Sequence, residues 1–153
     1  MQNRLLAAAL SVFTLATLAV VQGYQTGDGR RYFAPRTKAD AALPPFSGAV
    51  LANHTLYLAG ELGTDANNKL PDTPEAEAKA VLDKIQARLK SAGMTMDDLV
   101  SVQIFCSDVR HYAAFNEVYR GYFSKEYPAR AFIGSGGLLF GARFEVMGTA
   151  VKR

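Results

Sequence analysis

The sequence is poor in the residue types that build covalent and metal frameworks. It has one cysteine, two histidines and no tryptophan in 153 residues. A single cysteine excludes an intrachain disulfide framework, and so few soft ligands argue against a structural zinc site. The chain also lacks a nucleophile elbow, an H-E-x-x-H motif, a C-x-x-C motif and a phosphate-loop motif. The catalytic classes that these motifs indicate are therefore not expected.

The chain has no strong excess of charge of either sign. Its 17 Lys and Arg against 14 Asp and Glu give a net charge of +3, which is too small to indicate nucleic-acid binding, and we expect no such partner. With 49% hydrophobic and 20% charged residues, the composition is that of a folded chain. Its length is typical of one domain.

The first 23 residues differ from the rest. Arg4 is their only charged residue, and residues 5–21 follow as 17 uncharged positions. A basic start before an apolar run is typical of a secretory signal, so we predict a signal peptide over residues 1–23 and a periplasmic or secreted mature protein. A membrane anchor is the alternative, because 17 helical residues span about 26 Å, close to the ~30 Å of a bilayer core. A buried N-terminal helix is a third. Contact with a membrane is expected only if the segment stays uncleaved.

Turn-forming and basic residues dominate residues 24–43, which we therefore interpret as a solvated linker. The folded domain is predicted over residues 44–153. Five of its segments show strand character: residues 48–52, 55–60, 100–106, 131–133 and 143–151. One helix is predicted from the cap Thr73 to the stop signal Gly93, and a second after Asp108.

This order predicts an α+β fold, with one mixed sheet and two helices packed on one of its faces. We expect Tyr57, Phe105 and Phe144 on the other face. An uncovered apolar sheet face indicates self-association, so the chain is expected to be an oligomer.

Two charged residues stand out by their positions in predicted strands. Arg130 follows Pro128 at a strand start, where a guanidinium can grip a carboxylate with two parallel hydrogen bonds. Glu145 lies in an otherwise apolar strand and is a candidate acid or base. The residues alone leave open a structural ion pair between them. Cys106 is expected to be a small buried hydrophobe, and His54 an exposed turn residue.

Several short motifs match a known family in order and spacing. They are Pro45-Phe46-Ser47, 56–63 (LYLAGELG), 92–100 (AGMTMDDLV), 115–119 (FNEVY), Tyr122-Phe123, Pro128-Ala129-Arg130, 141–146 (GARFEV) and Ala150. On these the chain resembles the RidA/YjgF/UK114 (Rid) family, also labelled endoribonuclease L-PSP, over roughly residues 40–151. The resemblance implies a chorismate-mutase-like fold and a homotrimer with a central barrel. It also implies ligand clefts between subunits.

The resemblance further implies an imine and enamine deaminase, which hydrolyses 2-imino or 2-enamino acids to 2-keto acids and ammonia without metal or cofactor. Arg130 would clamp the substrate carboxylate, and Glu145 would activate or position water. Gly60 would contact the ligand through its backbone, and Phe46 and Phe132 would give the cleft apolar walls. Asn116 matches a recurring asparagine with a structural or cleft role.

The chain departs from the family pattern at Ala59, Glu61, Lys84, Phe132 and Leu139. These departures leave two questions open: which substrate the protein takes, and whether it retains catalysis. The alternative function is a non-catalytic trimer that binds a small carboxylate metabolite in the same clefts. A ribonuclease activity is the weakest interpretation, because the chain lacks an aromatic and basic RNA-binding motif.

Overall fold

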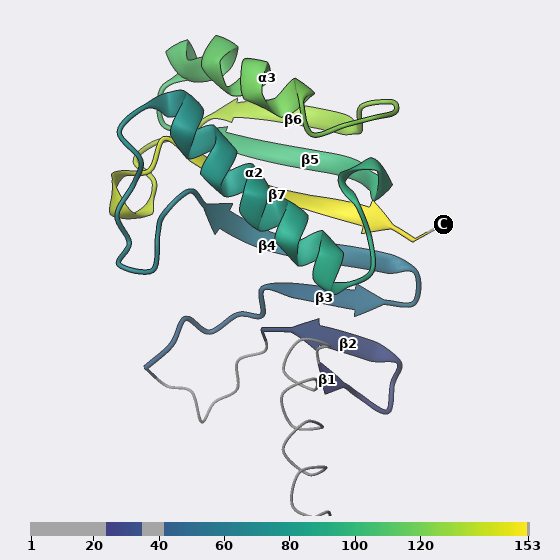
Figure 1. The fold of residues 1–153 in the computed structure, drawn as a ribbon. Coiled ribbons are helices and arrows are strands. Elements are labelled where there is room, and N and C mark those ends of the chain that lie inside the picture. Colours follow the sequence, from purple (N-terminus) through teal and green to yellow (C-terminus); the bar gives the residue numbers. More distant parts are fainter. Residues whose placement is uncertain (1–23, 35–41, 153) are drawn as a thin grey trace, which may run out of the picture.

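A computed structural model describes residues 24–34 and 42–152 of the chain. Its centre is a seven-stranded sheet in the order β1-β2-β3-β4-β7-β5-β6 (Figure 1). The strands are β1 (Tyr24–Gln25), β2 (Arg30–Phe33), β3 (Ala49–Ala52), β4 (Thr55–Leu62), β5 (Leu99–Cys106), β6 (Ala129–Gly134) and β7 (Phe144–Val151). Among these strands only the β5–β6 pair is parallel, so the sheet is mixed. Strand β6 comes last in the order and forms one edge of the sheet.

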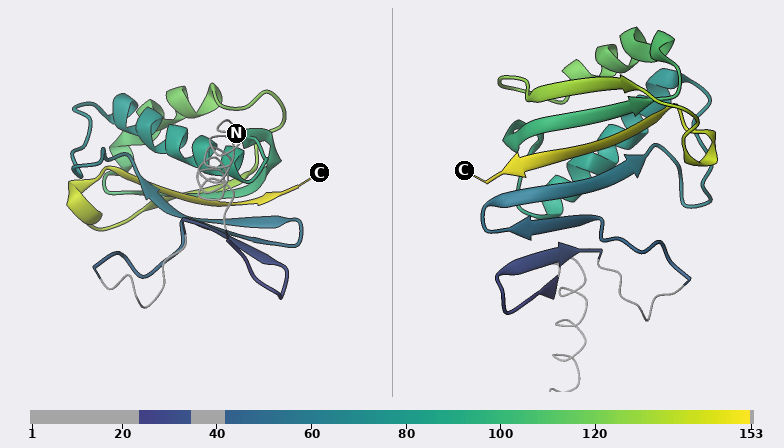
Figure 2. Two further views of the ribbon diagram at one scale, coloured as in Figure 1. Left: turned by 60° about the horizontal axis from the view of Figure 1, so that its bottom comes forward. Right: turned by 180° about the vertical axis from the view of Figure 1, so that it is seen from behind.

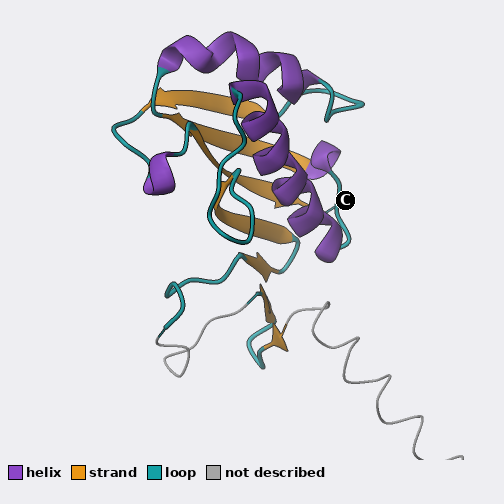
Figure 3. Cartoon of the chain, turned by 60° about the vertical axis from the view of Figure 1, so that its left-hand side comes forward, coloured by secondary structure: helices purple, strands orange, loops and turns teal. Residues whose placement is uncertain are grey.

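Two α-helices, α2 (Pro74–Ser91) and α3 (Tyr112–Arg120), lie side by side on one face of this sheet. Figure 2 shows both above the strands in its left-hand view, and Figure 3 shows the same layering from the side. Short 3-10 turns occur at η1 (Met96–Asp98), η2 (Val109–His111) and η3 (Leu139–Gly141). The predicted α+β sheet with two helices on one face is confirmed.

Helix α2 begins and ends where the local chemistry requires. The Thr73 hydroxyl accepts a hydrogen bond from the Ala76 amide at 3.2 Å, and Pro74 occupies the first helical position. Gly93, just past the helix, has a φ of +74°, which suits a residue without a Cβ. One apolar stripe at helical spacing along α2 is buried against the sheet; its members are Ala78, Val81, Leu82, Ile85 and Leu89.

The face of the sheet away from α2 and α3 carries apolar side chains that the described residues leave open. Tyr57 on β4 is 54% exposed and Met147 on β7 is 36% exposed. Phe144 was expected there, and that expectation is wrong. Its ring is fully buried under α3, 4.8 Å from the ring of Phe115. Alternation along β7 explains this, because Phe144 and Val146 face the helices while Glu145 between them faces away.

The predicted linker over residues 24–43 is corrected at its beginning. Strands β1 and β2 form a hairpin, and β2 pairs with β3 from Arg30↔Ala52 to Phe33↔Ala49. Phe33 is buried in the core. The turn chemistry at Gly29, with its φ of +81°, closes the hairpin rather than loosening the chain.

The predicted signal peptide over residues 1–23 lies outside the described residues. Within the part of the chain that the structure describes, neither helix combines the length and apolar character needed to cross a bilayer.

A candidate ligand pocket beside strand β6

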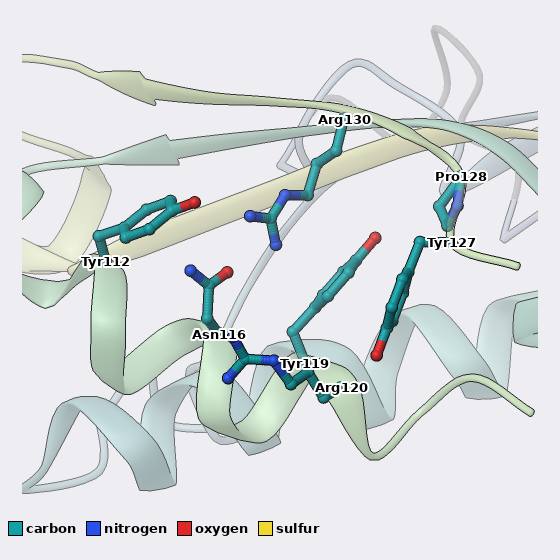
Figure 4. A pocket seen from close by; sticks show the side chains of 7 residues that line it. All are labelled: Tyr112, Asn116, Tyr119, Arg120, Tyr127, Pro128 and Arg130. Carbon is teal, nitrogen blue, oxygen red and sulfur yellow. The ribbon is translucent and has the colours of Figure 1, made fainter.

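Arg130 projects from β6, the edge strand, toward helix α3. It lines a pocket of about 250 Å³ whose walls come from α3 and from the segment before β6. The other lining residues are Tyr112, Asn116, Tyr119, Arg120, Tyr127 and Pro128. Figure 4 shows the Arg130 guanidinium pointing toward the amide of Asn116, so the structure brings these two predicted site residues together.

Aromatic rings hold the Arg130 guanidinium in place. Its Cζ lies 4.7 Å from the ring centroid of Tyr119 and 5.9 Å from that of Tyr112, both within cation–π range. These contacts restrict the side chain without neutralising it. Arg130 makes no ion pair with a carboxylate among the described residues. The pocket therefore presents a fixed, uncompensated cation.

Tyr119 forms the floor beneath this cation. Its side chain is 3% exposed, and its buried hydroxyl has no hydrogen-bond partner in the described residues. Burial raises the pKa of Tyr119 to about 12, against a smaller lowering by the Arg130 charge. The hydroxyl is therefore neutral at ordinary pH and keeps its proton.

The sequence analysis gave no site role to four of the lining residues: Tyr112, Tyr119, Arg120 and Tyr127. The spacing of these residues in the sequence could have indicated the pocket. Tyr112, Asn116, Tyr119 and Arg120 stand at i, i+4, i+7 and i+8, which places them on one helix face. A face that mixes tyrosine with asparagine and arginine is unusual for pure core packing.

Glu145 and Gly60 meet on the opposite face of the sheet. The pairing of β4 with β7 shifts between Leu58 and Glu61, and this bulge sets Gly60 against the Glu145 side chain. A Cβ on Gly60 would collide with Glu145 Oε1. A side chain at position 60 would therefore displace the Glu145 carboxylate.

A structural Arg130–Glu145 ion pair within the chain is excluded. Arg130 pairs in register with Val102, which is buried under the helices, whereas Glu145 pairs with Phe105 on the other face. The two predicted catalytic residues therefore lie on opposite faces of the sheet.

The two predicted apolar wall residues lie elsewhere. Phe46 is 55% exposed in the segment before β3. The Phe132 ring makes edge contacts with Tyr112 at 5.0 Å and Phe115 at 5.8 Å. It packs behind the pocket and is not among the residues that line it.

Two departures from the family pattern make defined contacts. Arg88 Nη2 donates to Glu61 Oε1 at 2.7 Å, and the pair is largely shielded from solvent. Lys84 Nζ donates to the Leu62 carbonyl at 2.8 Å. Both bonds join α2 to the end of β4, next to Gly60, so Glu61 and Lys84 help to hold the strand against which Glu145 lies.

The remaining cysteine and histidine candidates lie outside the pocket. Cys106 is fully buried, its Sγ donates to the Asp108 carbonyl, and burial raises the pKa of its thiol. His54 is exposed in the hairpin turn, as expected. No group of three potential metal ligands occurs in residues 24–34 and 42–152.

Comparison with known families identifies the fold. The family model described as Endoribonuclease L-PSP matches residues 36–152. The chain belongs to this family, that of the RidA and YjgF proteins. The predicted family is therefore confirmed.

Named relatives are similar over most of the chain. The 2-iminobutanoate/2-iminopropanoate deaminase of Capra hircus is 37% identical over 117 residues, covering 75% of this chain and 85% of the relative. The human protein of the same name is 33% identical over the same shares. RidA from the Antarctic bacterium Psychrobacter sp. PAMC 21119 has a TM-score of 0.69 at 29% identity, covering 85% of this chain and 98% of its own.

Proposed function

We propose that the protein is an imine and enamine deaminase, which hydrolyses 2-imino acids and their enamine tautomers to 2-keto acids and ammonia. The observation that carries the proposal is the Arg130 pocket, where a guanidinium without a carboxylate partner in the described residues lies beside Asn116. Relatives at 33–37% identity that are named for this reaction support it.

The chemistry requires few groups. Arg130 binds the substrate carboxylate through two parallel N–H donors, which fixes the imine carbon. Water adds to that carbon to give a carbinolamine, and the C–N bond then breaks to release ammonia and leave the keto oxygen. A carboxylate at Glu145 accepts a proton from the attacking water and returns it to the leaving nitrogen. The net reaction consumes one water and needs no redox partner.

Glu145 reaches the Arg130 pocket only from another copy of the chain, because the two lie on opposite faces of the sheet. We therefore propose a homotrimer whose open sheet faces meet in a central barrel. Each cleft then combines Arg130 and Asn116 of one subunit with Glu145 and Gly60 of its neighbour. The exposed apolar residues Tyr57 and Met147 would be covered in the barrel.

Turnover of a freshly generated imino acid tests the function. An amino-acid oxidase produces 2-iminobutanoate in the cuvette, and semicarbazide traps what remains of it. We expect the protein to lower the trapped fraction in proportion to its concentration. A trapped fraction that does not respond to the protein contradicts the deaminase and leaves the binding protein as the remaining interpretation.

The proposed trimer can be tested by its mass in solution. Light scattering on residues 24–153 at micromolar concentration should give three times the chain mass. Introducing a charge into the barrel by Met147→Glu should convert the trimer to monomer, because an unpaired charge would be desolvated there. The exposed Val109→Glu, outside the sheet, is the control. A stable monomer of the unaltered chain contradicts the shared cleft.

We also propose that residues 1–23 direct export and are removed. The uncharged run after Arg4 supports this. The intact mass of protein made in its native host should correspond to a chain that begins near residues 20–27. A soluble cytosolic species of full length contradicts export.

A further inference from the structure

The pocket beside β6 contains a second arginine. Arg120 ends helix α3, is exposed to solvent and lines the pocket together with Arg130. Figure 4 shows the Arg120 side chain reaching along α3 toward Asn116, whose amide points on to Arg130. Two guanidinium groups and one carboxamide thus face a single volume of about 250 Å³.

The charge of this pocket is unbalanced. The residues that line it include neither aspartate nor glutamate. Most other described arginines pair with a carboxylate: Arg30 with Asp28, Arg88 with Glu61, Arg110 with Asp108 and Arg143 with Glu77. Within residues 24–34 and 42–152, Arg120 and Arg130 form no such pair. Each guanidinium offers five N–H donors, and no carboxylate among the described residues of the same copy forms an ion pair with either.

We propose that this pocket selects substrates with two carboxylates, the 2-imino acids that derive from dicarboxylic amino acids. The inference rests on the proposed deaminase function and names its substrate class. Arg130 binds the carboxylate next to the imine carbon, and Arg120 binds the one at the end of the side chain. Asn116, between them, donates its amide N–H to the distal carboxylate and orients it.

The size of the pocket agrees with this assignment. A volume of about 250 Å³ leaves room for a small organic ligand. A five-carbon imino dicarboxylate is a ligand of this size. A ligand with a short apolar side chain would leave Arg120 with no anionic partner.

The position of Arg120 has a simpler explanation than ligand binding, and the experiment must distinguish the two. A cation in the last turn of a helix interacts favourably with the helix dipole. Lys90 also lies in the last turn of its helix, α2, outside the pocket, and is the matched control. A dipole role affects stability, whereas a ligand role affects the choice between substrates.

The test compares 2-iminoglutarate with 2-iminobutanoate, both generated in the assay. For each we measure kcat/KM with the unaltered protein, Arg120→Gln and Lys90→Gln. Hydrogen bonds to charged groups are strong enough that losing this contact should reduce the dicarboxylate preference at least about tenfold. Lys90→Gln should leave the preference unchanged. A preference that Arg120→Gln does not alter overturns the inference, while imine hydrolysis itself still supports the proposed function.

A second measurement does not depend on turnover. Calorimetry with the stable products 2-oxoglutarate and 2-oxobutanoate should give tighter binding of 2-oxoglutarate, and Arg120→Gln should abolish the difference. This result supports the two-cation pocket even if no imine is hydrolysed, in which case only the deaminase function fails. Equal affinities for both products in the unaltered protein overturn the inference.

Discussion

Replacing Arg130 with lysine should remove most of the imine-hydrolysing activity, and replacing it with alanine nearly all of it. The guanidinium offers two parallel donors in a plane, whereas an ammonium presents one point charge. Hydrogen bonds to charged groups contribute about 1.5–3 kcal/mol each, so kcat/KM should fall at least about tenfold in Arg130→Ala. The measurement is hydrolysis of 2-iminobutanoate by the unaltered protein and both variants.

The fold should survive this substitution, which makes the result interpretable. Arg130 is half-buried, lines a pocket and makes ring contacts with Tyr112 and Tyr119. Loss of these contacts costs about 1 kcal/mol, so melting curves should change little. Arg110→Ala, at an arginine whose side chain is 87% exposed and paired with Asp108, is the control. Unchanged turnover in Arg130→Ala would remove the catalytic assignment.

The helices and most strands could be predicted because their signals are local. A cap at Thr73, a stop at Gly93 and an apolar stripe between them determine α2 without reference to the rest of the molecule. Alternation along β4 predicted Tyr57 on the open face, and it lies there between the buried Leu56 and Leu58. The family resemblance then indicated which strand residues would bear the chemistry. The match over residues 36–152 confirms the family.

What could not be predicted depends on pairing between distant segments. The shift between β4 and β7 decides that Glu145 sits over Gly60, and no local pattern encodes a shift in register. The same holds for the separation of Arg130 from Glu145, since it depends on which strands flank β5. Residues 30–33 looked like solvated linker because their basic residues hid the apolar contact of Phe33.

Glu77, in the first turn of α2, has a role that no local pattern indicates. Its side chain is fully buried. Oε1 accepts hydrogen bonds from the backbone amides of Arg143 at 2.7 Å and Phe144 at 3.1 Å. Oε2 accepts one from Arg143 Nη1 at 2.7 Å. One carboxylate thus ties helix α2 to the start of β7, one residue before Glu145.

Replacing Glu77 with alanine should therefore destabilise the protein strongly. The change leaves a guanidinium and two amides without their acceptor in a largely buried place, at a cost of about 3 kcal/mol. A loss of this size lowers Tm by about 10 °C. Thermal and denaturant unfolding at one fixed protein concentration measure it, because association affects apparent stability.

The matched control is another ion pair of the same helix. Lys79 and Asp83 are 2.7 Å apart with side chains that are 65% and 48% exposed. Lys79→Gln should change stability by at most about 1 kcal/mol, because water screens the pair. If Glu77→Ala were as mild as Lys79→Gln, the start of β7 would be held by other contacts. If it is severe, the attachment of α2 to the start of β7, next to Glu145, depends on the Glu77 carboxylate.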